Sequence, residues 1–326
     1  TYLEKTFKET KVPVEVVDDD GPIIEPTFKA WWGVPDMPKI NFKNDGARQW
    51  ALDVTEHWIK NFDIDGWRMD VAKELDFSFW KDFRDVAYSA KKDILLISEI
   101  FGDTSQWLQG ERFDGTMNYS FRETMTDYFA TKRIDNKEFS NSLANLYSMY
   151  SFEALSSCQN LLSSHDVKRF LNRCGANTDG MFGAVFLQAT FPGIAGIYYG
   201  DEIGLGGADD PFNREPFPWE SEDKWNKDLL KFTSELMNIK TSQPILRYGN
   251  FEMVTYDDNY VIFRRVLNDE SLLCIVNRDL NNKAIELNTN AHSVDIVYGD
   301  CTIELDSGKL KITDIADNFG LIIKES

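Results

Sequence analysis

The stretch IDGWRMDVA at residues 64–72 decides the fold, because this short, half-apolar segment lies between two helical patterns. Before it, apolar residues recur at every fourth position across residues 50–62, and Asn44 or Asp45 can cap the start, which is typical of an amphipathic helix. After it, apolar residues follow helical spacing again across residues 79–87. The predicted order is therefore helix, strand, helix.

The alternation of strand and helix continues to about residue 243. Further strand candidates alternate with helix-like patterns, with strands at 94–99, 113–119, 160–164 and 194–199 and helices at 140–150, 167–174 and 228–240. This order indicates parallel β/α units. From about residue 247, short β-rich pieces separated by polar turns predict an antiparallel β-sandwich.

The number of β/α units is too small for a closed barrel. Only five units can be counted between residues 44 and 243, whereas a (β/α)8 barrel needs eight units and roughly 250 residues. Five open parallel strands would leave unpaired edges and an exposed apolar face. We therefore expect an α/β fold in which a (β/α)8 TIM-barrel domain is represented only by its later β/α units, followed by a C-terminal antiparallel β-sandwich.

Three carboxylates follow three of the predicted parallel strands: Asp70, Glu99 and Asp166. Each one alone could be a helix N-cap or a surface charge. Three in register point to an active site, because barrel enzymes build their sites at the C-terminal ends of the strands. Retaining glycoside hydrolysis needs a carboxylate nucleophile and a carboxylic acid about 5 to 5.5 Å apart, and neighbouring strands can present such a pair.

The residues around two of these acids suggest different roles. Arg68 lies two positions before Asp70, so both side chains point to one face of an extended strand, and the guanidinium can hold an ionised nucleophile in place. Glu99 follows an almost wholly apolar strand. Partial desolvation there favours the protonated acid, which a proton donor needs.

The same segments resemble conserved regions of the α-amylase family of glycoside hydrolases. The regions are GWRMDVAKE at residues 66–74, ISEIFGD at 97–103 and LLSSHDVKR at 161–169. MPKIN at 37–41 and SQWLQGERFDGTMNYSF at 105–121 resemble the neopullulanase, maltogenic amylase and cyclomaltodextrinase branch. This resemblance implies retaining cleavage of α-1,4-glucosidic bonds in cyclodextrins, pullulan, starch or maltooligosaccharides, with transglycosylation as a further outcome.

The resemblance also implies a role for each matched residue. Asp70 would be the catalytic nucleophile and Glu99 the general acid/base. Asp166 would stabilise the distorted sugar by hydrogen bonding, with Arg68 and His165 as its partners in the same subsite.

Two further segments bear on substrate binding. In DDPFNREPFPW at residues 209–219, the resemblance implies that Asp210 and Arg214 contact sugar hydroxyls on the non-reducing side; the alternative is a salt bridge within the loop. Phe101 stands where this branch usually has Trp, and Gly102 where His is common, so we expect Phe101 to contact substrate with altered sugar stacking on the acceptor side.

The N-terminal part of the family's conserved sequence pattern is absent from the chain. The first conserved region, which ends in Asn-His, has no counterpart. We expect a remnant of the loop domain inserted in the barrel at residues 1–43, the C-terminal part of the barrel at 44–246 and the sandwich at 247–326. The expected partners are an α-glucan or cyclodextrin substrate and the missing N-terminal part of the same enzyme, or a complementing chain.

Composition narrows the possible partners. With 35 basic and 54 acidic residues the net charge is -19, which would repel nucleic acid, and no apolar run is long enough to span a membrane. Four widely spaced cysteines predict reduced thiols and a cytoplasmic protein. Thr1 is not an initiating Met and begins no signal peptide, so we expect the natural N-terminus upstream.

The sequence contains no nucleotide-binding or zinc-protease motif, so we expect no required cofactor and no metal site, with calcium left open. Three other interpretations remain. The chain could be a non-catalytic α-amylase-like scaffold or interaction protein, its carboxylates could bind magnesium as in enolase-type barrels, or it could be an inactive fragment of a competent enzyme.

Overall fold

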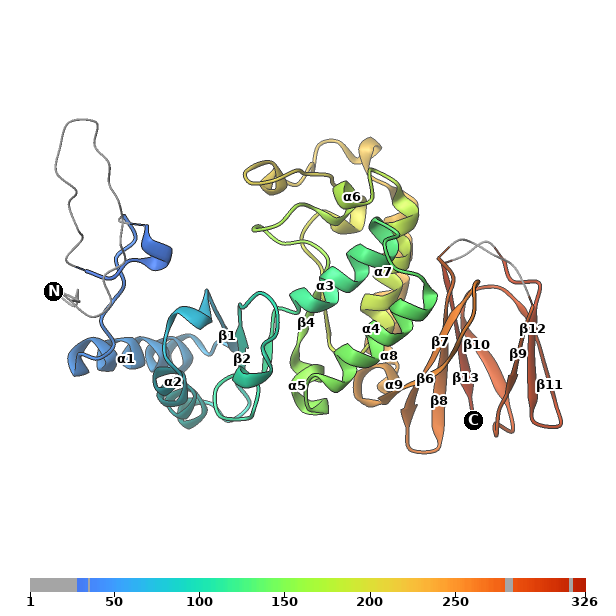
Figure 1. The fold of residues 1–326 in the computed structure, drawn as a ribbon, viewed down its shortest axis with the longest axis horizontal. Coiled ribbons are helices and arrows are strands. Elements are labelled where there is room, and N and C mark those ends of the chain that lie inside the picture. Colours follow the sequence, from blue (N-terminus) through green and yellow to red (C-terminus); the bar gives the residue numbers. More distant parts are fainter. Residues whose placement is uncertain (1–27, 35, 279–283, 317–318) are drawn as a thin grey trace. The chain divides into compact units, whose positions relative to one another are not determined.

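The computed structural model describes residues 28–34, 36–278, 284–316 and 319–326 (Figure 1). Residues 1–27 of the expected inserted-domain remnant therefore lie outside the described part. The chain divides into two compact units. The first unit runs to Glu99 and includes Gln109–Phe113, and the second unit contains Ile100–Leu108 and Asp114–Ser326.

The first unit has the predicted order of elements. They are a 3-10 turn (Trp31–Gly33), α1 (Asp45–Phe62), β1 (Gly66–Met69), a 3-10 turn (Ala72–Glu74), α2 (Phe77–Ala90) and β2 (Leu95–Ser98). The Asn44 side chain caps α1 by accepting from the Ala47 N–H, and Asp76 caps α2 in the same way. These caps satisfy backbone donors that a helix start leaves without partners.

Strands β1 and β2 pair in parallel, with Gly66 opposite Leu95 and Met69 opposite Ser98. A side chain at position 66 would overlap the Leu95 carbonyl oxygen, so glycine is needed where the strands come closest. Because the two strands end together, the residues that follow them, Asp70 and Glu99, emerge at one edge of the pair.

The second unit begins with the remaining β/α elements. The strands are β3 (Gly115–Thr116), β4 (Gln159–Leu161) and β5 (Ile194–Gly196). The α-helices are α3 (Tyr119–Met125), α4 (Asn136–Ser148), α5 (Phe152–Ser157), α6 (Phe170–Arg173), α7 (Thr178–Thr190), α8 (Lys227–Ser242) and α9 (Pro244–Tyr248). Short 3-10 turns lie at Ser105–Trp107, Asp201–Ile203, Phe212–Arg214 and Glu222–Lys224, and a π-helical segment lies at Thr126–Ala130. Strands β4 and β5 pair in parallel. Among the described residues, no helix has the length and apolarity that a membrane crossing requires.

The C-terminal region is the predicted antiparallel β-sandwich (Figure 1). Its strands are β6 (Asn250–Tyr256), β7 (Val261–Leu267), β8 (Glu270–Val276), β9 (Ile285–Asn288), β10 (Val294–Tyr298), β11 (Thr302–Asp306), β12 (Lys309–Thr313) and β13 (Gly320–Glu325). One sheet has the order β10-β13-β8-β7-β6 and the other β11-β12-β9. Apolar side chains from both sheets share one buried core, including Ile275 and Ile323 from the first and Leu310 and Ile312 from the second.

Two buried cations connect α7 to its neighbours. Lys240 on α8 donates to the carbonyl oxygens of Ala189 (3.0 Å) and Phe191 (3.3 Å), and Arg265 on β7 donates to that of Thr190 (2.6 Å). Carbonyls at a helix end have no partner within the helix, so these side chains supply one. Burial, with the nearby charge of Arg265, lowers the pKa of Lys240 to about 7.

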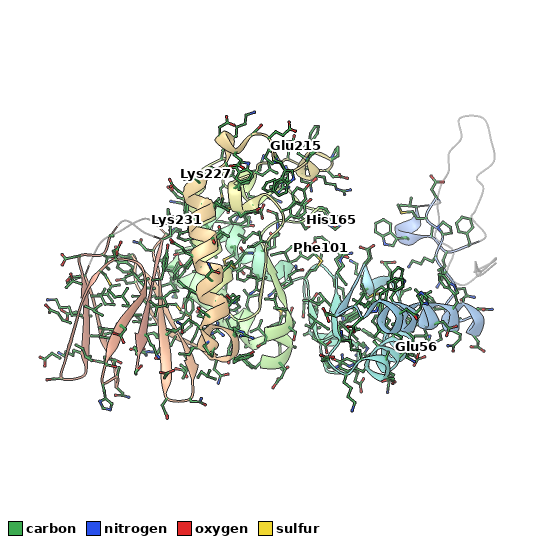
Figure 2. All side chains as sticks on the ribbon, turned by 180° about the vertical axis from the view of Figure 1, so that it is seen from behind. Glu56, Phe101, His165, Glu215, Lys227 and Lys231 are labelled. Carbon is green, nitrogen blue, oxygen red and sulfur yellow. The ribbon has the colours of Figure 1, made fainter. Side chains whose placement is uncertain are left out.

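The lowered pKa of Lys240 predicts a dependence of stability on pH. Between about pH 7 and pH 9 the unfolded chain keeps a proton that the folded protein increasingly lacks, so the free energy of unfolding should rise with pH, by at most about 1.4 kcal/mol per pH unit. Lys240→Met should flatten this rise, as measured by urea unfolding at several pH values. Lys231→Met, on an exposed position of the same helix (Figure 2), should keep the wild-type slope; equal slopes for wild type and Lys240→Met would contradict the prediction.

Candidate active site

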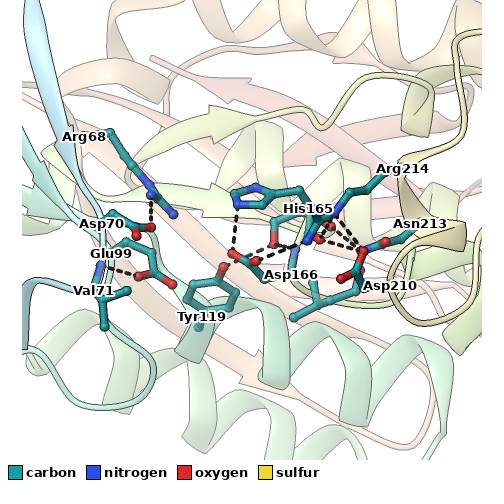
Figure 3. Close-up of polar contacts among 12 residues, drawn as sticks. Arg68, Asp70, Val71, Glu99, Tyr119, His165, Asp166, Asp210, Asn213 and Arg214 are labelled. Carbon is teal, nitrogen blue, oxygen red and sulfur yellow. Dashed lines mark hydrogen bonds and ion pairs between the residues drawn. The ribbon is translucent and has the colours of Figure 1, made fainter. Parts of the chain in front are cut away.

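Asp70 directly follows β1 and forms an ion pair with Arg68 (Figure 3). The Arg68 side chain is 33% exposed and that of Asp70 71% exposed. The predicted same-face arrangement of these residues is therefore present. The contact leaves the Asp70 carboxylate accessible to a ligand while the guanidinium fixes its orientation.

Glu99 is only 4% exposed and is held by the backbone that follows β1. Its Oε2 accepts the Val71 N–H at 2.8 Å (Figure 3), and its own N–H donates to the Met69 carbonyl at 2.9 Å. Val71 has a φ of 43°, in the left-handed region, which is strained for a β-branched residue. Such strain costs on the order of 1–3 kcal/mol and clusters at functional sites.

A cavity of about 420 Å³ adjoins Asp70 within the first unit. Its lining includes Trp31 and residues of the MPKIN segment, Met37, Lys39 and Ile40. Lys39 forms an ion pair with Glu74, which also lines the cavity. The MPKIN segment therefore lies beside Asp70, the predicted nucleophile, although the two are about thirty residues apart in the sequence.

His165 and Asp166 lie in the second unit, in the loop after β4. His165 Nε2 is 3.1 Å from Asp166 Oδ2, and Arg214 is 3.9 Å from the other Asp166 oxygen. Arg214 also forms an ion pair with Asp210 at 3.1 Å and donates to the His165 carbonyl at 3.0 Å (Figure 3). The salt bridge within the loop is therefore present, and the same Arg214 reaches the predicted sugar-binding residues.

Phe101 is also in the second unit and is 48% exposed. Its ring stacks on Tyr119, with centroids 3.8 Å apart and planes at 19°. The Tyr119 hydroxyl lies 3.2 Å from Ser164 Oγ, and Ser164 immediately precedes His165. Phe101 is thus supported by a residue that contacts the loop after β4, and its role toward substrate stays a prediction.

Asn213 and Arg169 shape this loop and were not among the predicted site residues. The buried Asn213 amide donates to the carbonyls of Ser164 (3.3 Å), His165 (2.9 Å) and Val167 (3.0 Å). Arg169, also fully buried, donates to the Asn213 carbonyl at 3.1 Å. Both side chains hold backbone groups in position, so we regard them as positioning residues.

The structure groups the predicted site residues by unit. In the first unit, Arg68 and Asp70 form an ion pair, and Glu99 follows the strand that pairs with theirs. In the second, His165 and Asp166 are joined to the loop that carries Asp210 and Arg214. Within the described ranges, no group of three or more His, Cys, Asp and Glu side chains is arranged to hold a metal ion.

Removing the Asn213 amide should loosen the loop after β4. Asn213→Ala leaves buried carbonyl groups without their donor, and we expect the free energy of unfolding to fall by about 1–3 kcal/mol, with faster amide hydrogen exchange at residues 164–167. Urea unfolding and exchange mass spectrometry measure the two effects. Asn238→Ala, at an exposed position on α8, is the matched control, and unchanged exchange in Asn213→Ala would refute the positioning role.

Comparison with known proteins gives the same family as the sequence motifs. The alpha amylase catalytic domain family matches residues 27–245. Cyclomaltodextrinase of Geobacillus thermopakistaniensis is 35% identical over 264 residues, which are 80% of this chain and 44% of that protein. Neopullulanase 2 of Thermoactinomyces vulgaris is 39% identical over 246 residues, 75% of this chain and 42% of that protein. The chain thus spans less than half the length of these relatives.

Solved structures agree with the predicted fold. The debranching enzyme of Nostoc punctiforme is similar with a TM-score of 0.85 and 27% identity, covering 98% of this chain and 70% of that one. A cyclomaltodextrinase structure gives a TM-score of 0.84 with 30% identity, covering 92% of this chain and 52% of that one. The chain belongs to the α-amylase family, and its relatives include the cyclomaltodextrinases and neopullulanases that its motifs resemble.

Proposed function

We propose that this chain, together with the remaining strands of a (β/α)8 barrel, is a retaining glycosidase that cleaves α-1,4-glucosidic bonds in cyclodextrins, pullulan, starch or maltooligosaccharides. One observation carries the proposal: Asp70 and Glu99 directly follow two strands that pair in parallel and in register. The two carboxyl groups that a retaining mechanism requires therefore start from one edge of the sheet.

The proposed reaction has two displacements. Asp70 attacks the anomeric carbon, while Glu99 protonates the leaving glycosidic oxygen, which gives a covalent glycosyl-Asp70 intermediate. Water then attacks the same carbon, Glu99 takes its proton, and Asp70 is released as a carboxylate. We assign the transferred proton to Oε1 of Glu99, because Oε2 already accepts the Val71 N–H.

Asp166 and its neighbours are proposed to bind the sugar that is being distorted. Asp166 can accept hydrogen bonds from sugar hydroxyls, while His165 Nε2 lies beside one of its oxygens and the Arg214 guanidinium lies beside the other and opposes its charge. Asp210, paired with Arg214, is proposed to contact the next sugar on the non-reducing side. We expect these steps to need no cofactor.

Replacing the nucleophile should abolish the covalent intermediate. In a protein that includes the remaining barrel strands, Asp70→Asn keeps the shape of the side chain but removes its charge, so we expect kcat/KM on maltooligosaccharides to fall by about 10³-fold or more. In the protein with Asp70 intact, a fluorinated glucosyl inhibitor should label Asp70, and peptide mass spectrometry identifies the labelled residue. Label on another residue would overturn the assignment. Loss of wild-type activity with EDTA would favour a magnesium site instead.

Replacing the acid should affect substrates according to their leaving groups. Glu99→Gln cannot donate a proton, so we expect hydrolysis of maltotriose to fall by roughly 10²- to 10⁴-fold. Hydrolysis of α-maltosyl fluoride should fall far less in its first step, because fluoride leaves without full protonation. Glu235→Gln, at an exposed position on α8, is the control. An equal loss for both substrates would exclude Glu99 as the proton donor.

A further inference from the structure

A cluster of aromatic side chains lies on the loop that carries Arg214. It consists of Phe217, Trp219 and Trp225. The Trp219 ring is 71% exposed, more than any other large hydrophobic side chain among the described residues. An exposed indole offers a flat apolar surface on which a ligand can stack.

The exposed ring is held in place by its neighbours. Phe217 lies 4.3 Å from Trp219 between ring centroids, at an interplanar angle of 41°, and Trp225 lies 6.5 Å away. Trp225 is itself fixed, because its indole N–H donates to the Pro218 carbonyl at 3.1 Å and the Lys227 ammonium lies 4.4 Å from its ring centroid. A ring supported in this way loses little conformational freedom when it binds a ligand.

The cluster is continuous with the proposed sugar-binding residues. Trp219 is five residues after Arg214, and five residues span at most about 17 Å, which a short oligosaccharide can bridge. The Tyr199 hydroxyl fixes the intervening chain by donating to the Glu215 carbonyl at 2.8 Å. In Figure 2, Glu215 and His165 lie on the same side of α8, whose position is marked by Lys227 and Lys231.

We propose that Trp219 is a stacking platform for a glucose unit of an α-glucan chain, on the non-reducing side and beyond the sugar contacted by Asp210 and Arg214. The C–H face of a glucose ring is flat and apolar, so it matches an exposed indole, while its hydroxyls stay in water. Glu222 pairs with Lys227 at 3.4 Å, so these two charges oppose each other, and a neutral ligand suits this surface because no unbalanced positive charge from this pair is left to attract an anion. This inference rests on the proposed function and extends it.

The test measures maltoheptaose binding by titration calorimetry in an Asp70→Asn background, where the ligand is not consumed. Adding Trp219→Ala should raise the Kd roughly tenfold, and Trp219→Phe should restore binding to within about threefold. The loss should be larger for maltoheptaose than for maltotriose, because the longer chain can contact Trp219 in addition to the residues Asp210 and Arg214. Trp58→Ala, another exposed tryptophan on α1, should leave the Kd unchanged.

The outcomes separate this inference from the proposed function. Tight maltoheptaose binding in Trp219→Ala, together with normal hydrolysis by the protein with Asp70 intact, would overturn the platform and leave the function standing. Trp219-dependent binding without hydrolysis, in a protein that includes the remaining barrel strands, would support the platform and overturn the function. A dimer that Trp219→Ala converts to a monomer would assign the ring to an interface between copies, and absence of any maltoheptaose binding would overturn both proposals.

Discussion

The parallel pairing of β1 with β2 is the constraint on which the proposed chemistry depends. Because Met69 lies opposite Ser98, the chain leaves both strands at the same level, and the next residues are the two carboxylates. The left-handed conformation of Val71 then turns its N–H toward Glu99. A β-branched residue there is strained, and the ladder of backbone hydrogen bonds on either side makes that strain tolerable.

The second unit positions its residues by a different physical means. The loop after β4 lies outside the named strands, and buried side chains donate hydrogen bonds to its backbone. Asn213 binds three of its carbonyl groups, and Arg169 fixes Asn213 in turn. A buried polar group without a partner costs more free energy than its hydrogen bond contributes, and this asymmetry selects one loop conformation. His165 and Asp166 belong to this loop, so its conformation sets their positions.

Much of this arrangement could be predicted from local pattern, and the rest depends on contacts that local pattern does not encode. Helix α1 and its Asn44 cap were predictable, since one face is apolar and the other polar. Helix α7 was not predicted, because nearly all of its residues are buried and a helix buried on every side has no amphipathic period. Asn213 was missed because its partners lie 46 to 49 residues away. Trp219 lay inside a recognised segment, but its exposure could not be predicted from the sequence.

The contacts of the three carboxylates also differ in charge, which bears on the division of roles among them. Asp70 pairs with a guanidinium, and Asp166 lies between an imidazole and a guanidinium. In the part of the chain that the structure describes, the donor to the Glu99 side chain is the neutral Val71 N–H. A guanidinium orients a carboxylate by charge as well as by hydrogen bonding, whereas a backbone N–H fixes the one oxygen that it contacts. In the proposed mechanism Asp70 alternates between a carboxylate and an ester while Glu99 alternates between acid and base, so the Arg68 ion pair would orient Asp70 and the Val71 N–H would orient Glu99.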